Sequence, residues 1–103
     1  MRQNFVGSQL CTTAAGQAVG ILGKPVRVFI VHILSGGTAG IIKLYNGSTT
    51  SNTLVVQQTC TAVSTGNTFD YGEYGILFPL GCFYEEVSDA NVVSTLITFE
   101  QEA

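Results

Sequence analysis

Hydrophobic residues along most of this chain alternate with other residues at a period of two, and short polar or glycine-rich clusters interrupt the pattern. A period of two places successive side chains on opposite faces of a β-strand. No window sustains the spacing of an amphipathic helix. The pattern therefore predicts seven or eight short strands separated by turns. The expected strands are 26–34, 40–45, 53–59, 68–71, 74–78, 82–87 and 92–100.

These strands lie too close together in the sequence for parallel pairing, because a parallel crossover needs a dozen or more residues. We therefore expect an all-β fold, a single antiparallel β-sandwich of jelly-roll type, over residues 26–103. Residues 1–25 are richer in alanine, glycine and glutamine and contain no acidic residue. We expect this segment to form a loose N-terminal arm or an extra strand.

Segment 26–34 is apolar on both of its expected faces. A regular strand would place Val26, Val28, Ile30, His32 and Leu34 on one face, and Arg27, Phe29, Val31 and Ile33 on the other. In a small antiparallel domain, one face of each sheet normally meets water. We therefore expect another copy or another protein to cover the second face, which indicates assembly and not catalysis.

The composition supports a partly covered surface. Charged residues make up 11% of the 103 residues and hydrophobic residues 46%, whereas monomer surfaces usually carry charges at about 25–35% of positions. The alternative is a surface made soluble by threonine, serine, asparagine and glutamine. The formal net charge of -3 provides no basic footprint for nucleic acid. No apolar stretch resembles a membrane helix or a signal peptide, so we expect synthesis in the cytoplasm and no membrane contact.

Candidate reactive residues are few and scattered. Cys11, Cys60 and Cys82 are too widely spaced for a zinc motif, and their odd number argues against a disulfide framework. We expect buried free thiols, although one disulfide with one free thiol remains an alternative. The single histidine, His32, lies within a strand and has no sequence partner for a triad or metal site. We expect it to be a buried or interface residue with one hydrogen bond.

The carboxylates give no strong catalytic pattern either. A glycosidase needs two carboxylates about 5–10 Å apart across a cleft, and the neighbours Glu85 and Glu86 point to opposite faces of one strand. Calcium binding by Asp70, Glu73 and loop oxygens is a weak alternative. The sequence therefore predicts no catalytic, cofactor-binding or metal-binding residue.

Exposed tyrosines could anchor an interface or stack on sugars. Tyr71 and Tyr74, which flank Gly72 and Glu73, are the expected exposed pair. A glycan site would combine them with the polar loop 46–52. The complete set of predicted interface residues is Phe5, Val6, Leu10, Phe29, Val31, Ile33, Tyr71 and Tyr74.

The order of the segments adds one resemblance. A long strand at 26–34 leads through glycine-rich residues 35–40 to 41–47, a serine- and threonine-rich loop follows, and then come 68–72, 75–82 and a closing strand. Over residues 26–100 this order resembles small all-β virion structural proteins of tailed bacteriophages, of the capsid-decoration or cement kind.

This resemblance implies a non-enzymatic subunit on the capsid surface of a virion. Its implied partners are copies of itself, with a trimer favoured, and the major capsid protein or another virion protein. The alternatives are a tail or portal adaptor and a lectin-like, glycan-binding module on a tail fibre. Residues 2–19 are the candidate arm, whose deletion is expected to weaken assembly more than folding.

Overall fold

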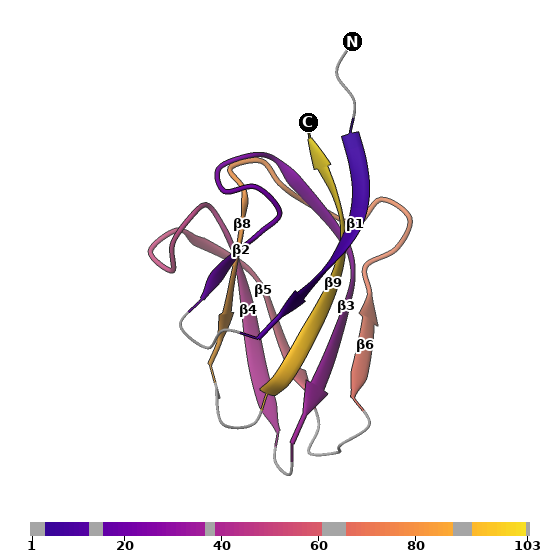
Figure 1. Cartoon of the computed structure of the whole chain (residues 1–103). Helices are drawn as coiled ribbons and strands as arrows, with labels where there is room; N and C mark the ends of the chain where they lie inside the picture. The colour runs from indigo at the N-terminus through magenta and orange to yellow at the C-terminus, as the bar shows by residue number, and fades with distance from the viewer. Residues whose placement is uncertain (1–3, 13–15, 37–38, 61–65, 88–91, 103) are drawn as a thin grey trace.

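The chain folds into two antiparallel β-sheets packed face to face (Figure 1). This structure is a computed structural model that describes residues 4–12, 16–36, 39–60, 66–87 and 92–102, without the side chains of Asn4, Phe5 and Glu102. Within these ranges no residue is helical. The predicted all-β antiparallel sandwich is confirmed.

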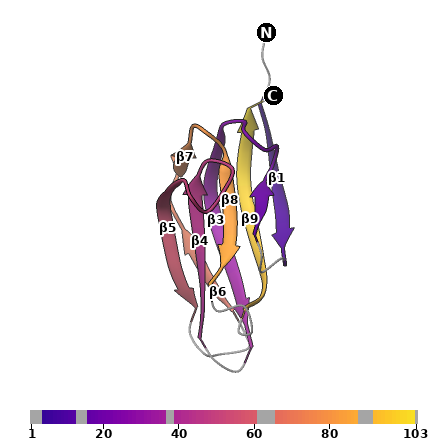
Figure 2. The ribbon, with the colours of Figure 1, turned by 90° about the vertical axis from the view of Figure 1, so that its left-hand side faces the viewer.

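Each sheet combines strands from both halves of the chain. Sheet A has the order β1 (Asn4–Cys11), β9 (Val92–Glu102), β3 (Val26–Ser35) and β6 (Asn67–Asp70), and β7 (Ile76–Phe78) also pairs with β3. Sheet B has the order β2 (Gln17–Val19), β8 (Cys82–Glu86), β4 (Gly40–Asn46) and β5 (Thr53–Cys60). Strand β1 lies at one lateral side of the sandwich and β5 at the other (Figure 2).

The described parts of the first 25 residues, 4–12 and 16–25, belong to the sandwich. Strand β1 pairs with β9 along its full length, and β2 pairs with β8. Cys11 and Val19 reach the core, where both are fully buried. The described residues before residue 26 therefore fit the alternative of an extra strand better than that of a loose arm, since they add two strands, β1 and β2, to the sheets.

Strand β3 contains a β-bulge that changes which of its side chains face the core. The register with β9 shifts between Val28 and Ile30, so that Phe29 is the additional residue. The expected two faces of a regular strand are therefore wrong, and Ile30 and Leu34 lie on the outer face of sheet A. The residues that share the core face are Val26, Val28, Val31 and Ile33.

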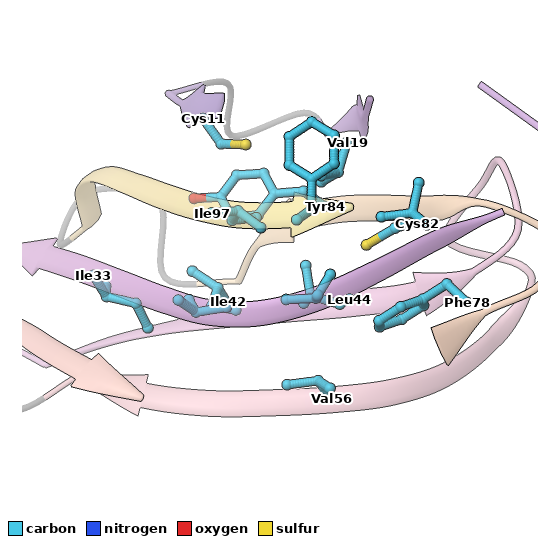
Figure 3. Close-up of a cluster of buried hydrophobic side chains, with 14 of the residues drawn as sticks. Cys11, Val19, Ile33, Ile42, Leu44, Val56, Phe78, Cys82, Tyr84 and Ile97 are labelled. Carbon is cyan, nitrogen blue, oxygen red and sulfur yellow. The ribbon is translucent and has the colours of Figure 1, made fainter. Parts of the chain in front are cut away.

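The space between the sheets is filled by side chains from nearly every strand (Figure 3). Phe78 and Tyr84 are the largest side chains that are fully buried. The smaller ones that Figure 3 labels come from both sheets, which makes one continuous core. They are Cys11, Val19, Ile33, Ile42, Leu44, Val56, Cys82 and Ile97.

Two glutamines of sheet A hold the segment 18–25, which leads from β2 in sheet B to β3 in sheet A. The side chain of Gln9 donates to the carbonyl of Ala18 and accepts from the amide of Gly20, both at 2.8 Å. Gln101 does the same further along the segment. These side chains replace the ladder bonds that the main chain gives up where it crosses between sheets.

We expect Gln101→Leu to lower the free energy of unfolding by about 1–3 kcal/mol, because two main-chain groups lose their partners. The Gln101 side chain is fully buried, accepts from the Ile21 amide at 2.6 Å and donates to the Pro25 carbonyl at 3.0 Å. Urea denaturation measures the loss. The matched control is Gln57→Leu on exposed β5, which should change stability by less than about 0.5 kcal/mol. Equal effects of the two substitutions would contradict this role.

Candidate assembly surface

A polar cluster in the interior, formed by Tyr84, Glu86 and Thr95, is closed to solvent. The hydroxyl of Tyr84 donates to Glu86 Oε2 at 2.7 Å and lies 2.8 Å from Thr95 Oγ1. Tyr84 and Thr95 are fully buried, and Glu86 is nearly so. Burial raises the pKa of Tyr84 far above its usual value of 10.0. A neutral, hydrogen-bonded tyrosine in this position stabilises the fold and offers no surface to a substrate.

The other carboxylates lie apart from this cluster. Glu85 is on the outer face of sheet B and accepts a hydrogen bond of 2.8 Å from the Tyr45 hydroxyl, so it points away from Glu86 as the sequence predicts. Asp70 accepts from the Gly72 amide at 2.8 Å. Among the described residues, no three His, Cys, Asp or Glu side chains are arranged to hold a metal ion.

The three cysteines are free and buried, as expected. Burial raises the pKa of Cys11 from 9.0 to about 12. Burial also raises the pKa of Cys82. Thiols of this kind are protonated at neutral pH and react poorly.

The outer face of sheet A is where exposed apolar side chains meet across strands. The pairing of β1, β9, β3 and its edge partners aligns residues in three rows. His32 belongs to the first row, is half-buried and has its Nδ1 2.7 Å from Thr68 Oγ1. The rows are Leu10–Leu96–His32–Thr68, Ser8–Thr98–Ile30–Asp70 and Val6–Glu100–Arg27–Leu77.

Among the described side chains, the part of this face nearest the lateral edge carries one charged group, Glu100, which lies beside Val6. We define the edge surface as Val6, Ser8 and Leu10 of β1 with Leu96 and Thr98 of β9. Val6 is 66% exposed, Leu10 59% and Leu96 41%. The hydroxyl oxygens of Ser8 and Thr98 are 3.4 Å apart. The edge surface thus presents three aliphatic side chains and two hydroxyls to solvent, beside the edge of the sheet.

Two of the predicted interface residues, Val6 and Leu10, lie together on this surface. Tyr74 is also exposed, at 79%, but it lies beyond β3, where Arg27 Nη1 donates to its carbonyl at 2.7 Å. Phe29 is half-buried at the bulge. The side chain of Phe5 lies outside the described part of the structure.

Three other predicted interface residues need correction. Val31 and Ile33 are fully buried, because the bulge turns both toward the core. Tyr71 is half-buried, packs against the core and has a buried hydroxyl, so it is no exposed partner for Tyr74. Leu96 was not among the predicted residues, since only the pairing of β9 with β1 places it beside Leu10.

The residues considered for a glycan site do not form one surface. Loop 46–52 and the connection 71–75 lie on opposite sides of the molecule (Figure 1). The side-chain oxygen of Asn52 already accepts from the amides of Ser48 and Thr49, both at 3.0 Å. The structure therefore does not bring loop 46–52 together with Tyr74.

No protein-family model matches the chain, and no curated protein is significantly similar to it. In the part of the chain that the structure describes, no helix is long and apolar enough to cross a bilayer.

Proposed function

We propose that this chain is a structural subunit that assembles with copies of itself and with a larger protein shell. The observation that carries the proposal is the edge surface, where Val6, Leu10 and Leu96 are exposed beside an unpaired strand edge. Exposed apolar areas on small proteins commonly mark interaction sites. Because only 11% of the residues are charged, electrostatic repulsion does little to prevent such surfaces from associating.

The strand order supports this role. If β6 and β7 count as one interrupted strand, sheets of order β1-β9-β3-β6 and β2-β8-β4-β5 face each other. We infer that the sandwich is a jelly roll, an architecture used by viral capsid proteins and lectins. A fold alone does not assign a function. Together with the edge surface and the resemblance to phage virion proteins, it favours a decoration or cement subunit on a capsid.

The placement of the reactive side chains also fits a structural role. Glu86 is enclosed in the core with Tyr84, whereas Glu85 lies on the outer face of sheet B. Asp70 is exposed and bonded to its own turn. These carboxylates come from separate places in the fold and do not face one another across a common cleft.

Sedimentation velocity over a wide concentration range tests self-assembly. We expect the wild-type chain to associate as its concentration rises, and the double variant Val6→Thr/Leu10→Thr to associate much less while keeping its monomer stability. Threonine preserves strand propensity and removes exposed aliphatic surface. The matched control, Leu54→Thr/Val55→Thr, removes the same kind of exposed side chain from β5 at the other lateral side. A wild-type chain that stays monomeric at every concentration would overturn the proposal.

A further inference from the structure

We propose that β1 pairs antiparallel with β1 of a second copy, around a two-fold axis at Ser8, so that sheet A continues through both subunits. This inference rests on the proposed function and specifies the contact through which copies associate. It requires an open edge on β1, no comparable edge elsewhere and a strand that complements itself.

The edge of β1 is long and regular. On one side β1 pairs with β9 over eight residues, Asn4 to Cys11, without a register shift. In the described part of the chain, no strand pairs with its other side. The strand contains no charged residue and no proline. Its unpaired amide and carbonyl groups therefore form a template for another extended strand.

The other edges of the sandwich carry features that discourage such pairing. Strand β2 is only three residues long. Strand β5 has a register shift beside Val55, and a bulge disturbs the ladder that a neighbour would need. On the far side of sheet A, β6 and β7 are short and are separated by residues 71–75. Among the described strands, β1 is the edge best suited to accept a partner.

A second copy fits this edge because β1 is self-complementary. With Ser8 on the axis, Val6 lies opposite the partner's Leu10, and Leu10 lies opposite the partner's Val6. Each pair continues onto Leu96 of β9, which neighbours Leu10 in the same row. Glu100 flanks Val6 and lies far from its own symmetry mate. The contact therefore joins apolar groups to apolar groups and places no like charges opposite each other.

The size of the contact sets its strength. Residues 5–11 would pair, a length of about 24 Å at about 3.4 Å per residue. A ladder of this length is smaller than a standard interface of about 1,600 Å². We therefore expect the isolated dimer to dissociate on dilution, and repeated copies on a shell to hold it through multivalency. The two-fold symmetry predicts even-numbered assemblies and not the trimer that the resemblance implies.

Disulfide trapping tests the pairing in the full-length protein. Residues directly opposite in an antiparallel ladder have Cα atoms about 4.5–5.5 Å apart, a distance that a disulfide spans. We expect Ser8→Cys to give a covalent dimer under mild oxidation. The matched control is Thr98→Cys, on the same face one strand inward. Its symmetry mate would be about 14 Å away, beyond the reach of a disulfide. The buried Cys11, Cys60 and Cys82 are common to both variants.

A charge exchange at Ser8 tests the two-fold axis directly, because a residue on the axis meets itself. We expect Ser8→Lys and Ser8→Glu each to weaken self-association by about tenfold, and an equimolar mixture of the two to restore it. Ser8 is exposed, so neither substitution should reduce the melting temperature of the monomer much.

The outcomes separate this inference from the proposed function. If the wild-type chain associates but Ser8→Cys forms no more dimer than Thr98→Cys, the β1 pairing is overturned and self-assembly through another surface stands. Association of Ser8→Lys as strong as that of wild type overturns the pairing as well. If the wild-type chain never associates, the proposed function itself fails.

Discussion

A chain without residues 1–19 is expected to be unfolded, because the deletion removes an integral part of the sandwich. The eight-residue ladder between β1 and β9 would be lost, at about 0.5–1.5 kcal/mol for each hydrogen bond. The core would lose Cys11 and Val19, each apolar side chain contributing about 1.5–3 kcal/mol. The sum is of the order of 10 kcal/mol, which approaches the entire stability of about 5–15 kcal/mol for a small domain.

Circular dichroism and urea denaturation of the truncated chain measure this effect. The comparison is the full-length variant Val6→Thr/Leu10→Thr, which keeps β1 in place and should retain a cooperative unfolding transition. The sequence alone favoured the opposite result, with assembly affected more than folding. A truncated chain that unfolds cooperatively near the wild-type midpoint would show that β1 behaves as an arm after all.

Stability should fall steeply above pH 9, because the folded protein holds protons on buried groups that the unfolded chain releases. The pKa of Cys11 rises from 9.0 to about 12 on folding, and the pKa of Cys82 also rises. A group whose pKa is raised by folding stabilises the folded state fully below its unfolded pKa. This stabilisation is lost as the pH rises toward the pKa of the folded state. Each costs about 1.4 kcal/mol per pH unit, so the two thiols together remove about 5 kcal/mol between pH 9 and 11. Above its usual pKa of 10.0, Tyr84 adds to this loss.

Urea denaturation from pH 8 to pH 11, under reducing conditions, gives the slope. The control variant Cys82→Ala carries one buried thiol fewer, so its stability should decline about half as steeply from pH 9 to 10, where the two thiols dominate. Identical slopes for the wild-type chain and this variant would rule out Cys82 as a source of the alkaline loss.

The strands from residue 26 onward could be predicted because their apolar residues mark the period clearly. The expected strand 26–34 corresponds to β3 (Val26–Ser35), and the expected strand 82–87 corresponds to β8 (Cys82–Glu86). The bulge in β3 could not be predicted in the same way. A bulge adds one residue, and where every neighbour is apolar, as around Phe29, the sequence does not show where the period slips.

Strand β1 could not be assigned because its own residues signal it weakly. Glycine, serine and glutamine interrupt its alternation, and its structure depends on pairing with β9, as between Ser8 and Thr98. Strand preference in such segments is decided by the neighbouring strand more than by the segment itself. Val6 and Leu10 could be predicted as interface residues from the sequence. Leu96 could not, because only the pairing of β9 with β1 places it beside Leu10.

The place of β9 has a consequence for synthesis on the ribosome. In sheet A, β9 lies between β1 and β3. These two early strands therefore cannot pair with β9 until it has been translated, about sixty residues after β3. Such long-range closure slows folding. A nascent chain that stops before residue 92 therefore has no completed sheet A, and translation errors of this kind yield products for proteolysis. Only a chain translated through β9 can hold β1 in sheet A, because β9 is the strand with which β1 pairs.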